Sequence, residues 1–183
     1  MAPEGALRLR AEDADDLAVI SACVQDALIS VRDLTFDRDA RSFTVVANRF
    51  RWESQPNANS RSANSPGANS PGANSPGANS RGANGSTVFE RTLCALLFGA
   101  VDRVSYRGFR RSDEDRILSL LAIRVDHNPG GDKPGIIDLE FSGGAAVRLS
   151  IAAISCHATD VGEPWPTAWQ PDHPPDLPGD EPQ

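Results

Sequence analysis

The sequence predicts an α+β protein in which one N-terminal helix packs on a strongly bent antiparallel sheet, or on a partly closed barrel, of seven to eight strands. Only one stretch, close to the N-terminus, spaces its apolar residues at the period of a helix. Most of the remaining chain alternates between apolar and polar residues, which is typical of strands with one buried face. These segments follow one another through short turns, and such connections favour antiparallel neighbours.

The first elements are a short strand and the helix. Residues 7–10, "LRLR", alternate in the manner of an edge strand, and the helical spacing begins just after them. Asp13 suits the N-cap, and Asp15 and Asp16 favour the positive end of the helix dipole. The apolar stripe of this helix consists of Leu17, Ile20, Val24 and Leu28.

Two strands joined by the polar turn "DRDAR" follow the helix. Residues 34–36 and 43–47 each place apolar side chains at every second position. Phe50 and Trp52 lie on the opposite parity from Phe43, so the pattern predicts a β-bulge near Asn48.

A repeat tract over residues 54–86 interrupts the strands. Its unit, A-N-S-(P/R)-(G/S), recurs every five residues and contains no apolar residue larger than alanine. Such a segment cannot bury a face, and the successive Pro-Gly pairs exclude a helix or a strand. We expect a disordered loop inserted in a hairpin.

The second half of the chain predicts further strands. Residues 93–98 are apolar on both faces, which favours a central strand, and residues 101–106 and 117–125 are expected to follow as strands. "IIDLEF" and "AVRLSI", joined by residues 142–144, form the clearest predicted hairpin. Residues 152–160 are either a continuation of that strand or a short helix.

The C-terminal end is rich in proline. Residues 163–183 include seven prolines, so they are expected to be extended without regular structure. The predicted organisation is one globular domain over residues 1–172, interrupted by the tract, and a flexible acidic tail over residues 173–183.

Composition and charge restrict the classes of function. The net charge is −7, with −5 on residues 1–40, −6 on residues 158–183 and +4 between them. The acidic ends disfavour nucleic acid as a general partner, while the middle leaves room for a small basic patch. No secretory signal starts the chain, and the longest apolar run, about nine residues, is too short to cross a bilayer. Three cysteines without a C-x-x-C pair fit a reducing cytoplasm.

The residue types that usually carry catalysis do not form a recognisable motif. Cys156 and His157 are adjacent and would point to opposite faces of a strand, while His127 and Asp132 flank a glycine-rich loop without further ligands. Residues 113–115 read as a polar turn, and Gly143 and Gly144 as a hairpin turn. The sequence therefore predicts no metal and no cofactor, and an enzyme is less expected than a binding protein.

The candidate binding residues form a basic group. "NRFRW" alternates arginines with aromatic residues, and "RGFRR" adds three more arginines. Arginines beside aromatic side chains can hold a phosphate-bearing ligand or stack RNA bases, whereas the simpler interpretation is a solvated arginine face over an aromatic core. The candidates are Asn48, Arg49, Arg51, Arg107, Arg110 and Arg111.

Two stretches resemble a bacterial family known only as domain of unknown function 2948. They are "DLAVISACVQDALISVRDLTFDRDARSFTVVANRFRWE" and "CALLFGAVDRVSYRGFRRSDEDRILSLLAIR", and "IDLEFSGGAAVRLSI" with Trp165 fits the C-terminal part. The resemblance covers residues 7–53 and 92–165 and implies a soluble bacterial protein, but no chemistry. We predict a cytoplasmic binding or interaction module of unknown ligand. The alternatives are an RNA- or nucleotide-binding domain that uses the arginines, and a small enzyme with a loop-assembled site.

Overall fold

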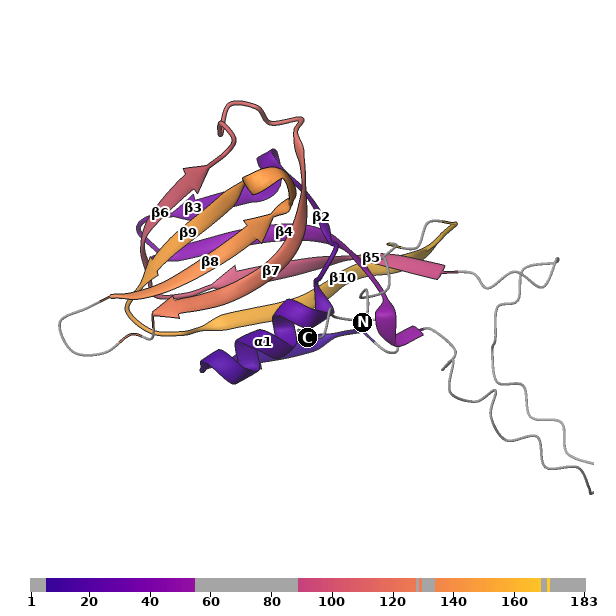
Figure 1. Cartoon of the computed structure of the whole chain (residues 1–183). Helices are drawn as coiled ribbons and strands as arrows, with labels where there is room; N and C mark the ends of the chain where they lie inside the picture. The colour runs from indigo at the N-terminus through magenta and orange to yellow at the C-terminus, as the bar shows by residue number, and fades with distance from the viewer. Residues whose placement is uncertain (1–5, 55–88, 128, 130–133, 169–170, 172–183) are drawn as a thin grey trace, which may run out of the picture.

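A computed structural model describes residues 6–54, 89–127, 129, 134–168 and 171, and Figure 1 shows the chain. The predictions of a disordered tract and a flexible tail therefore concern residues outside this part, apart from Ser54, and Asp132 also lies outside it. In chain order the elements are β1 (Arg8–Ala11), α1 (Ala14–Cys23), β2 (Leu28–Ser30), η1 (Val31–Asp33), β3 (Leu34–Asp37), β4 (Ser42–Phe50), η2 (Trp52–Ser54), β5 (Phe89–Phe98), β6 (Val101–Arg107), β7 (Ile117–His127), β8 (Gly135–Phe141), η4 (Ser142–Gly144), β9 (Ala146–Ile151) and β10 (Cys156–Thr167).

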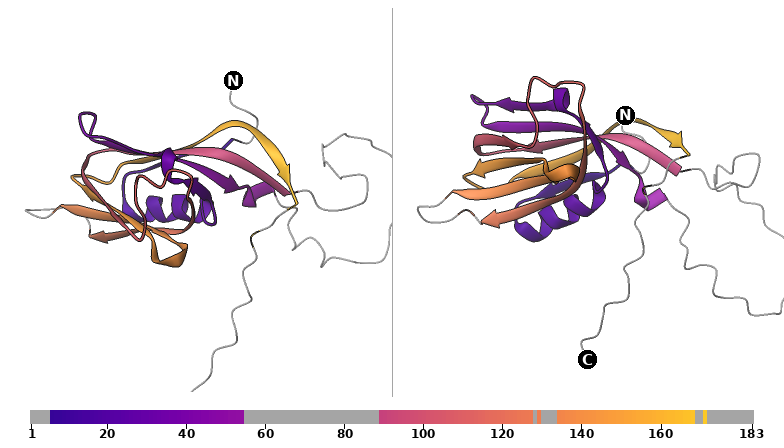
Figure 2. Two further views of the ribbon diagram at one scale, coloured as in Figure 1. Left: turned by 90° about the horizontal axis from the view of Figure 1, so that it is seen from above. Right: turned by 45° about the horizontal axis from the view of Figure 1, so that its top comes forward.

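The described strands form one antiparallel sheet in the order β1-β10-β5-β4-β2-β7-β8-β9-β6, with β3 paired to β4. This confirms the predicted α+β class with one helix and a mostly antiparallel sheet. The predicted count of seven to eight strands is wrong, because the sheet has ten, and the barrel is not confirmed, because the sheet is not closed. The sheet folds over so that β4, β5 and β10 form one layer and β7, β8 and β9 the other (Figure 2).

The helix begins as predicted and ends earlier. The Asp13 carboxylate accepts a hydrogen bond from the Asp16 backbone N–H at 2.8 Å, and Leu17 and Ile20 are buried. Leu28 does not belong to the helical stripe, because it starts β2 instead. Asp26 adopts a positive φ of 59°, which is incompatible with continuing the helix, and its N–H bonds to β7.

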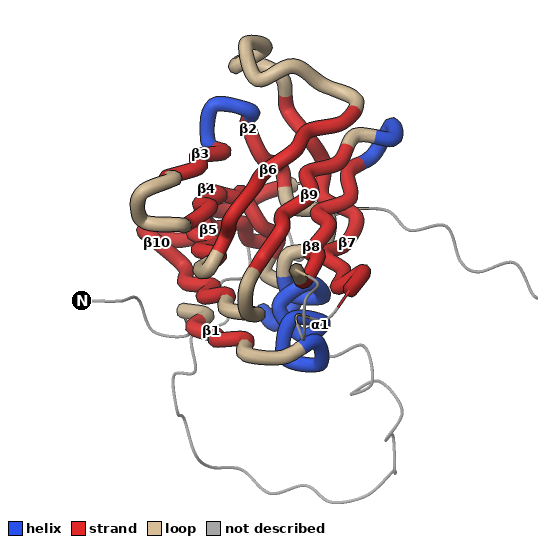
Figure 3. The backbone as a smooth tube through the Cα atoms, turned by 90° about the vertical axis from the view of Figure 1, so that its left-hand side faces the viewer, coloured by secondary structure: helices blue, strands red, loops and turns tan. Residues whose placement is uncertain are grey.

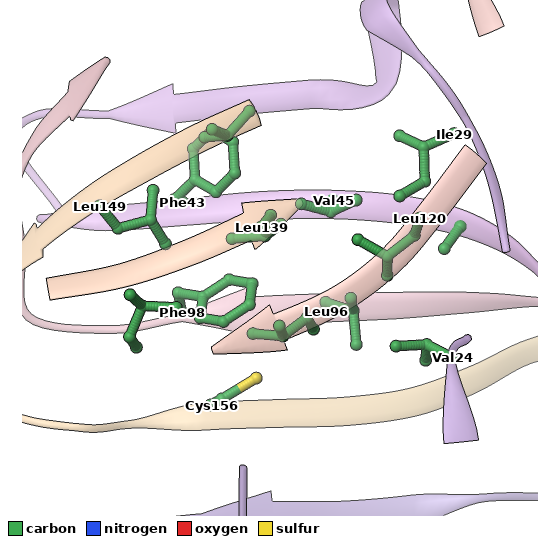
Figure 4. Packing of buried hydrophobic residues seen from close by; sticks show 14 of the residues in the cluster. Val24, Ile29, Phe43, Val45, Leu96, Phe98, Leu120, Leu139, Leu149 and Cys156 are labelled. Carbon is green, nitrogen blue, oxygen red and sulfur yellow. The ribbon is translucent and has the colours of Figure 1, made fainter. Parts of the chain in front are cut away.

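The core lies between the two layers of the sheet. Phe43 and Phe98 face each other from β4 and β5 with ring centroids 6.4 Å apart, and Leu139 and Leu149 approach them from the other layer (Figure 4). The buried side chains of α1 join the same cluster, so the helix lies on the inner side of the sheet.

Strand β4 runs through without the predicted bulge near Asn48. Its register with β5 is unbroken from Phe43 opposite Phe98 to Phe50 opposite Arg91. The alternation that buries Phe43 therefore continues and turns Arg49 inward. Phe50 lies on the outer side, where Trp52 and Phe89 cover its ring at centroid distances of 4.6 and 5.6 Å.

The proline-rich end contains a strand that the sequence did not predict. β9 ends at Ile151, and residues 156–167 form β10, which pairs with β5 and β1, so most of the undecided segment is strand rather than helix. β1 pairs with β10 only as far as Thr159. Beyond the bond from the Asp160 N–H to the Leu7 carbonyl, no described strand pairs with this edge of β10. Such an edge tolerates Pro164 and Pro166, which have no N–H to donate.

Removing the repeat tract is expected to leave the fold intact. Phe50 and Arg91 are paired neighbours, so a short turn can join β4 and β5 after residues 56–86 are deleted. Lengthening a loop from ~5 to ~35 residues costs only about 1.7 kcal/mol of closure entropy, so deletion should stabilise slightly. Thermal unfolding of the full and shortened chains checks this, and a melting temperature lower by several degrees after deletion would contradict it.

Candidate functional site

The outer side of β5 and its two neighbours carries large apolar side chains. Leu93 and Leu97 of β5 are 39% and 43% exposed, and Val161 of β10 is 39% exposed. The register places Leu93 between Asn48 of β4 and Val161, and it places Ala95 between Val46 and Thr159. We call this surface, made by Val46, Leu93, Ala95, Leu97 and Val161, the β5 face.

Two arginines lie at one border of the β5 face. At the paired positions of β4, β5 and β10, none of the side chains that point outward is a carboxylate. The chain as a whole has a net charge of −7. Arg8 and Arg10 of β1 lie beside Thr159 and His157 at one border, and both arginines are exposed. Arg10 also pairs with the exposed carboxylate of Glu12. The face is therefore an apolar centre bordered by Arg8 and by the Arg10–Glu12 ion pair.

An ion cluster lies beneath the β5 face, on the inner side, with Arg49 and Asp160 buried and the Glu53 side chain 45% exposed. Arg49 is 0% exposed, and its guanidinium donates from Nε and Nη2 to the two oxygens of Asp160 at 2.7 and 2.6 Å. It also donates to both oxygens of Glu53 at 2.7 and 3.1 Å. Asp160 accepts a further bond from the Leu7 N–H at 2.9 Å. The cluster ties β4 to β10, η2 and the N-terminal segment.

The partners of Arg49 determine the protonation states of the cluster. Burial by itself lowers the pKa of Arg49, but hydrogen bonds and charges from Asp160 and Glu53 outweigh burial and hold that pKa above its ordinary value. Partial burial raises the pKa of Glu53, whereas the hydrogen bonds from Arg49 bring it below its ordinary value overall. Both groups are charged at neutral pH, so the cluster is a structural ion network and not an acid–base pair.

The interpretation of Arg49 and Arg51 as a solvated face is wrong. Arg49 occupies the inward position of β4 and is completely buried. Arg51 is only 13% exposed and donates to Glu90 at 2.7 Å. Arg49 lies six positions after Phe43, so the alternation of β4 already placed it on the inward side. The sequence did not reveal that Asp160 would lie within reach.

The structure does not bring the six candidate residues together. Asn48 lies on the outer side of β4 beside Leu28 and Leu93. Arg107, Arg110 and Arg111 are exposed at the end of β6 and in the turn after it, and the sheet order separates β6 from β4 by four strands. The described residues therefore do not form the single arginine surface that an RNA- or nucleotide-binding site would need.

The cysteines offer no nucleophile. Cys156 is buried and His157 is exposed, which confirms that they point to opposite faces of a strand. Burial raises the pKa of Cys94 and of Cys156 to about 12, and it also raises the pKa of Cys23. These thiols are protonated at neutral pH, whereas a reactive cysteine needs a thiolate.

Neither a metal centre nor a membrane span is found in the described part of the chain. No group of three or more His, Cys, Asp or Glu side chains there is arranged to hold a metal ion. The predicted pair of His127 and Asp132 lies outside the described side chains, and residues 113–115 are exposed as predicted for a turn. No described helix has the length and apolar character to span a membrane.

Comparison with known proteins places the chain in one family. No curated protein and no solved structure matches it. The profile of a family described as "Protein of unknown function (DUF2948)" matches residues 7–173, most of the chain, including β1 to β10 and the buried ion cluster. The chain therefore belongs to the DUF2948 family, as the resemblance of its strands had indicated.

Proposed function

We propose that this protein is an interaction module that binds a protein partner through the β5 face. The observation that carries the proposal is the exposure of Leu93 beside Val161, together with Leu97 four residues further along the same side of β5. Soluble proteins rarely leave contiguous large apolar side chains in water unless the patch serves an interaction. Their outward position costs hydration free energy, which a partner that covers them would recover.

The border of the β5 face supports a partner with acidic groups around an apolar segment. Arg8 and Arg10 flank the apolar centre, and Glu12 compensates only Arg10 among the described residues. Complementary charges at the rim of an interface accelerate association and select the orientation of the partner, while the desolvated apolar centre supplies most of the affinity. The partner that fits is a protein segment with leucine-like side chains flanked by Asp or Glu.

We further propose that this binding takes place in the cytoplasm and involves no chemical reaction. The three cysteines are all free, which agrees with a reducing compartment. Their raised pKa values and the charged, fully paired state of Arg49 support binding rather than catalysis.

The decisive variant replaces Leu93 and Leu97 with glutamine. We expect this variant to have the melting temperature of the native chain. In a pull-down from extract of the cells that make the protein, we expect it to lose a partner that the native chain captures. Val19→Gln is the matched control, because Val19 is a large exposed apolar residue on α1, away from the face. The captured partner is then purified, and Arg8→Glu with Arg10→Glu is expected to weaken its binding about tenfold or more at low salt.

Two outcomes would overturn the proposal. One is capture of the same proteins by the native chain and by the Leu93→Gln, Leu97→Gln variant. The other is sedimentation of the purified native chain as a dimer that this variant converts to a monomer, which would assign the face to a second copy of the chain.

A further inference from the structure

A depression of about 240 Å³ lies on the outer side of β6, β9 and β8, which run side by side (Figure 3). Its floor is Ala146 of β9. The register places Arg107 of β6 on one side of Ala146 and Glu140 of β8 on the other. Because Ala146 has only a methyl group, the two long charged side chains rise above it on opposite walls.

The next row of the sheet closes one end of the depression with a paired arginine. Arg148 donates to both oxygens of Asp138 at 2.8 and 2.6 Å and to Asp126 at 3.2 Å. These hydrogen bonds and charges raise the pKa of Arg148 above its ordinary value. Its charge is therefore compensated within the protein, and Ser105, opposite Arg148 in the register, adds a hydroxyl to the same end.

The two walls keep hydrogen-bonding capacity that the described residues do not use. The Arg107 side chain takes part in none of the hydrogen bonds or ion pairs among the described residues. On the opposite wall Glu140 accepts from Arg124 Nε through Oε2 at 3.1 Å, and its Oε1 has no described donor. An unpaired cation thus faces a carboxylate with a free oxygen across the alanine floor.

From this arrangement we infer that the depression binds a small zwitterion, a molecule with both a carboxylate and an ammonium group, such as a free α-amino acid. The ligand carboxylate lies on the Arg107 guanidinium, whose planar fork matches two carboxylate oxygens. The ligand ammonium donates to Glu140 Oε1. The Ser105 hydroxyl is within the same lining and can bond the carboxylate.

The lining selects against ions of one sign. Asp138 and Glu140 both line the depression, so a phosphate dianion would meet two carboxylates there. A simple cation would be repelled by Arg107 and Arg148, which line the same depression. The volume is also below the ~300–1,000 Å³ of pockets for drug-sized ligands, which restricts the occupant to a small molecule.

The test is a titration followed by nuclear magnetic resonance of the full chain with L-alanine as the probe. We expect saturable shifts of the amide signals of β6, β8 and β9, with a dissociation constant in the millimolar range or below. Acetate, methylammonium and inorganic phosphate, each carrying one sign of charge, are expected to bind about tenfold more weakly or worse.

Variants of the two walls complete the test. Arg107→Ala and Glu140→Gln should each weaken alanine binding about tenfold or more. Arg103→Ala is the matched control, because Arg103 is an exposed arginine on the same side of β6 that does not line the depression, and it should bind alanine like the native chain. Thermal unfolding of all three variants reports whether the sheet is intact.

Three results would overturn the inference. They are the absence of saturable shifts with alanine, binding of acetate or phosphate as tight as that of alanine, and equal losses in Arg103→Ala and Arg107→Ala. The second result would assign the depression to simple anions instead.

Discussion

Replacing Arg49 with alanine is expected to lower the free energy of unfolding by about 3–5 kcal/mol, the cost of breaking a buried ion pair from one side. The guanidinium is 0% exposed, and its removal leaves Asp160, which is itself 6% exposed, without its two charged hydrogen bonds. The measurement is denaturant unfolding of the native chain and the variant. We expect a lower denaturant concentration at the midpoint of unfolding and an unchanged dependence of the free energy of unfolding on denaturant concentration.

Two further variants test whether the loss comes from the Arg49–Asp160 ion pair or from removing any charged side chain. Arg124→Ala removes an arginine whose side chain is 68% exposed and pairs with Glu140, and it should cost less than ~1 kcal/mol. Arg49→Met combined with Asp160→Leu replaces both charges by apolar groups and should cost less than the two single changes together. A loss under ~1 kcal/mol for Arg49→Ala would show that Arg49 is solvated after all.

Replacing Phe98 with alanine is expected to lower the free energy of unfolding by about 3–5 kcal/mol, because it opens a cavity at the centre of the core. Phe98 is fully buried, and it packs against Phe43 inside the sheet. Its neighbour Leu97 points to the opposite side and is 43% exposed. Leu97→Ala should therefore cost only about 1 kcal/mol or less.

The pair of variants is a direct test of which side of β5 faces the core. Adjacent residues of one strand share the backbone pairing, so the difference between them isolates side-chain burial. Chemical denaturation measures both. Equal losses for Phe98→Ala and Leu97→Ala would mean that the β5 face is covered by other parts of the chain, and it would also remove the basis for the proposed partner.

The parts of the fold that the sequence predicted are those set by local pattern. Asp13 capped the helix as expected, and the two glycines after Ser142, with φ of 70° and 76°, turn the β8–β9 hairpin. β2 was missed because three residues are too few to show an alternation. The end of β10 was missed because Pro164 and Pro166 argue against a strand. They are tolerated because no described strand pairs with that edge of β10 beside them.

The sites needed information that the local sequence does not contain. The arginines were grouped because they lie close together in the chain or share aromatic neighbours. Pairing across the sheet instead joins Arg49 to Asp160, 111 positions later, and joins Arg107 to Glu140 across Ala146. A side chain's burial and its partner depend on which strands become neighbours, and strand order follows from the packing of the whole chain.

The position of β10 has a consequence for how the protein is made. Among the described residues β1 pairs with β10 alone, and β10 also supplies one of the two neighbours of β5. At a synthesis rate of ~5–20 residues per second, roughly 3–12 s separate the end of β5 at Phe98 from the start of β10 at Cys156. During that time one hydrogen-bonding edge of β5, an apolar strand, has no partner. Unpaired apolar edges are where nascent chains aggregate, so this protein is expected to depend on chaperones most strongly until its last strand leaves the ribosome.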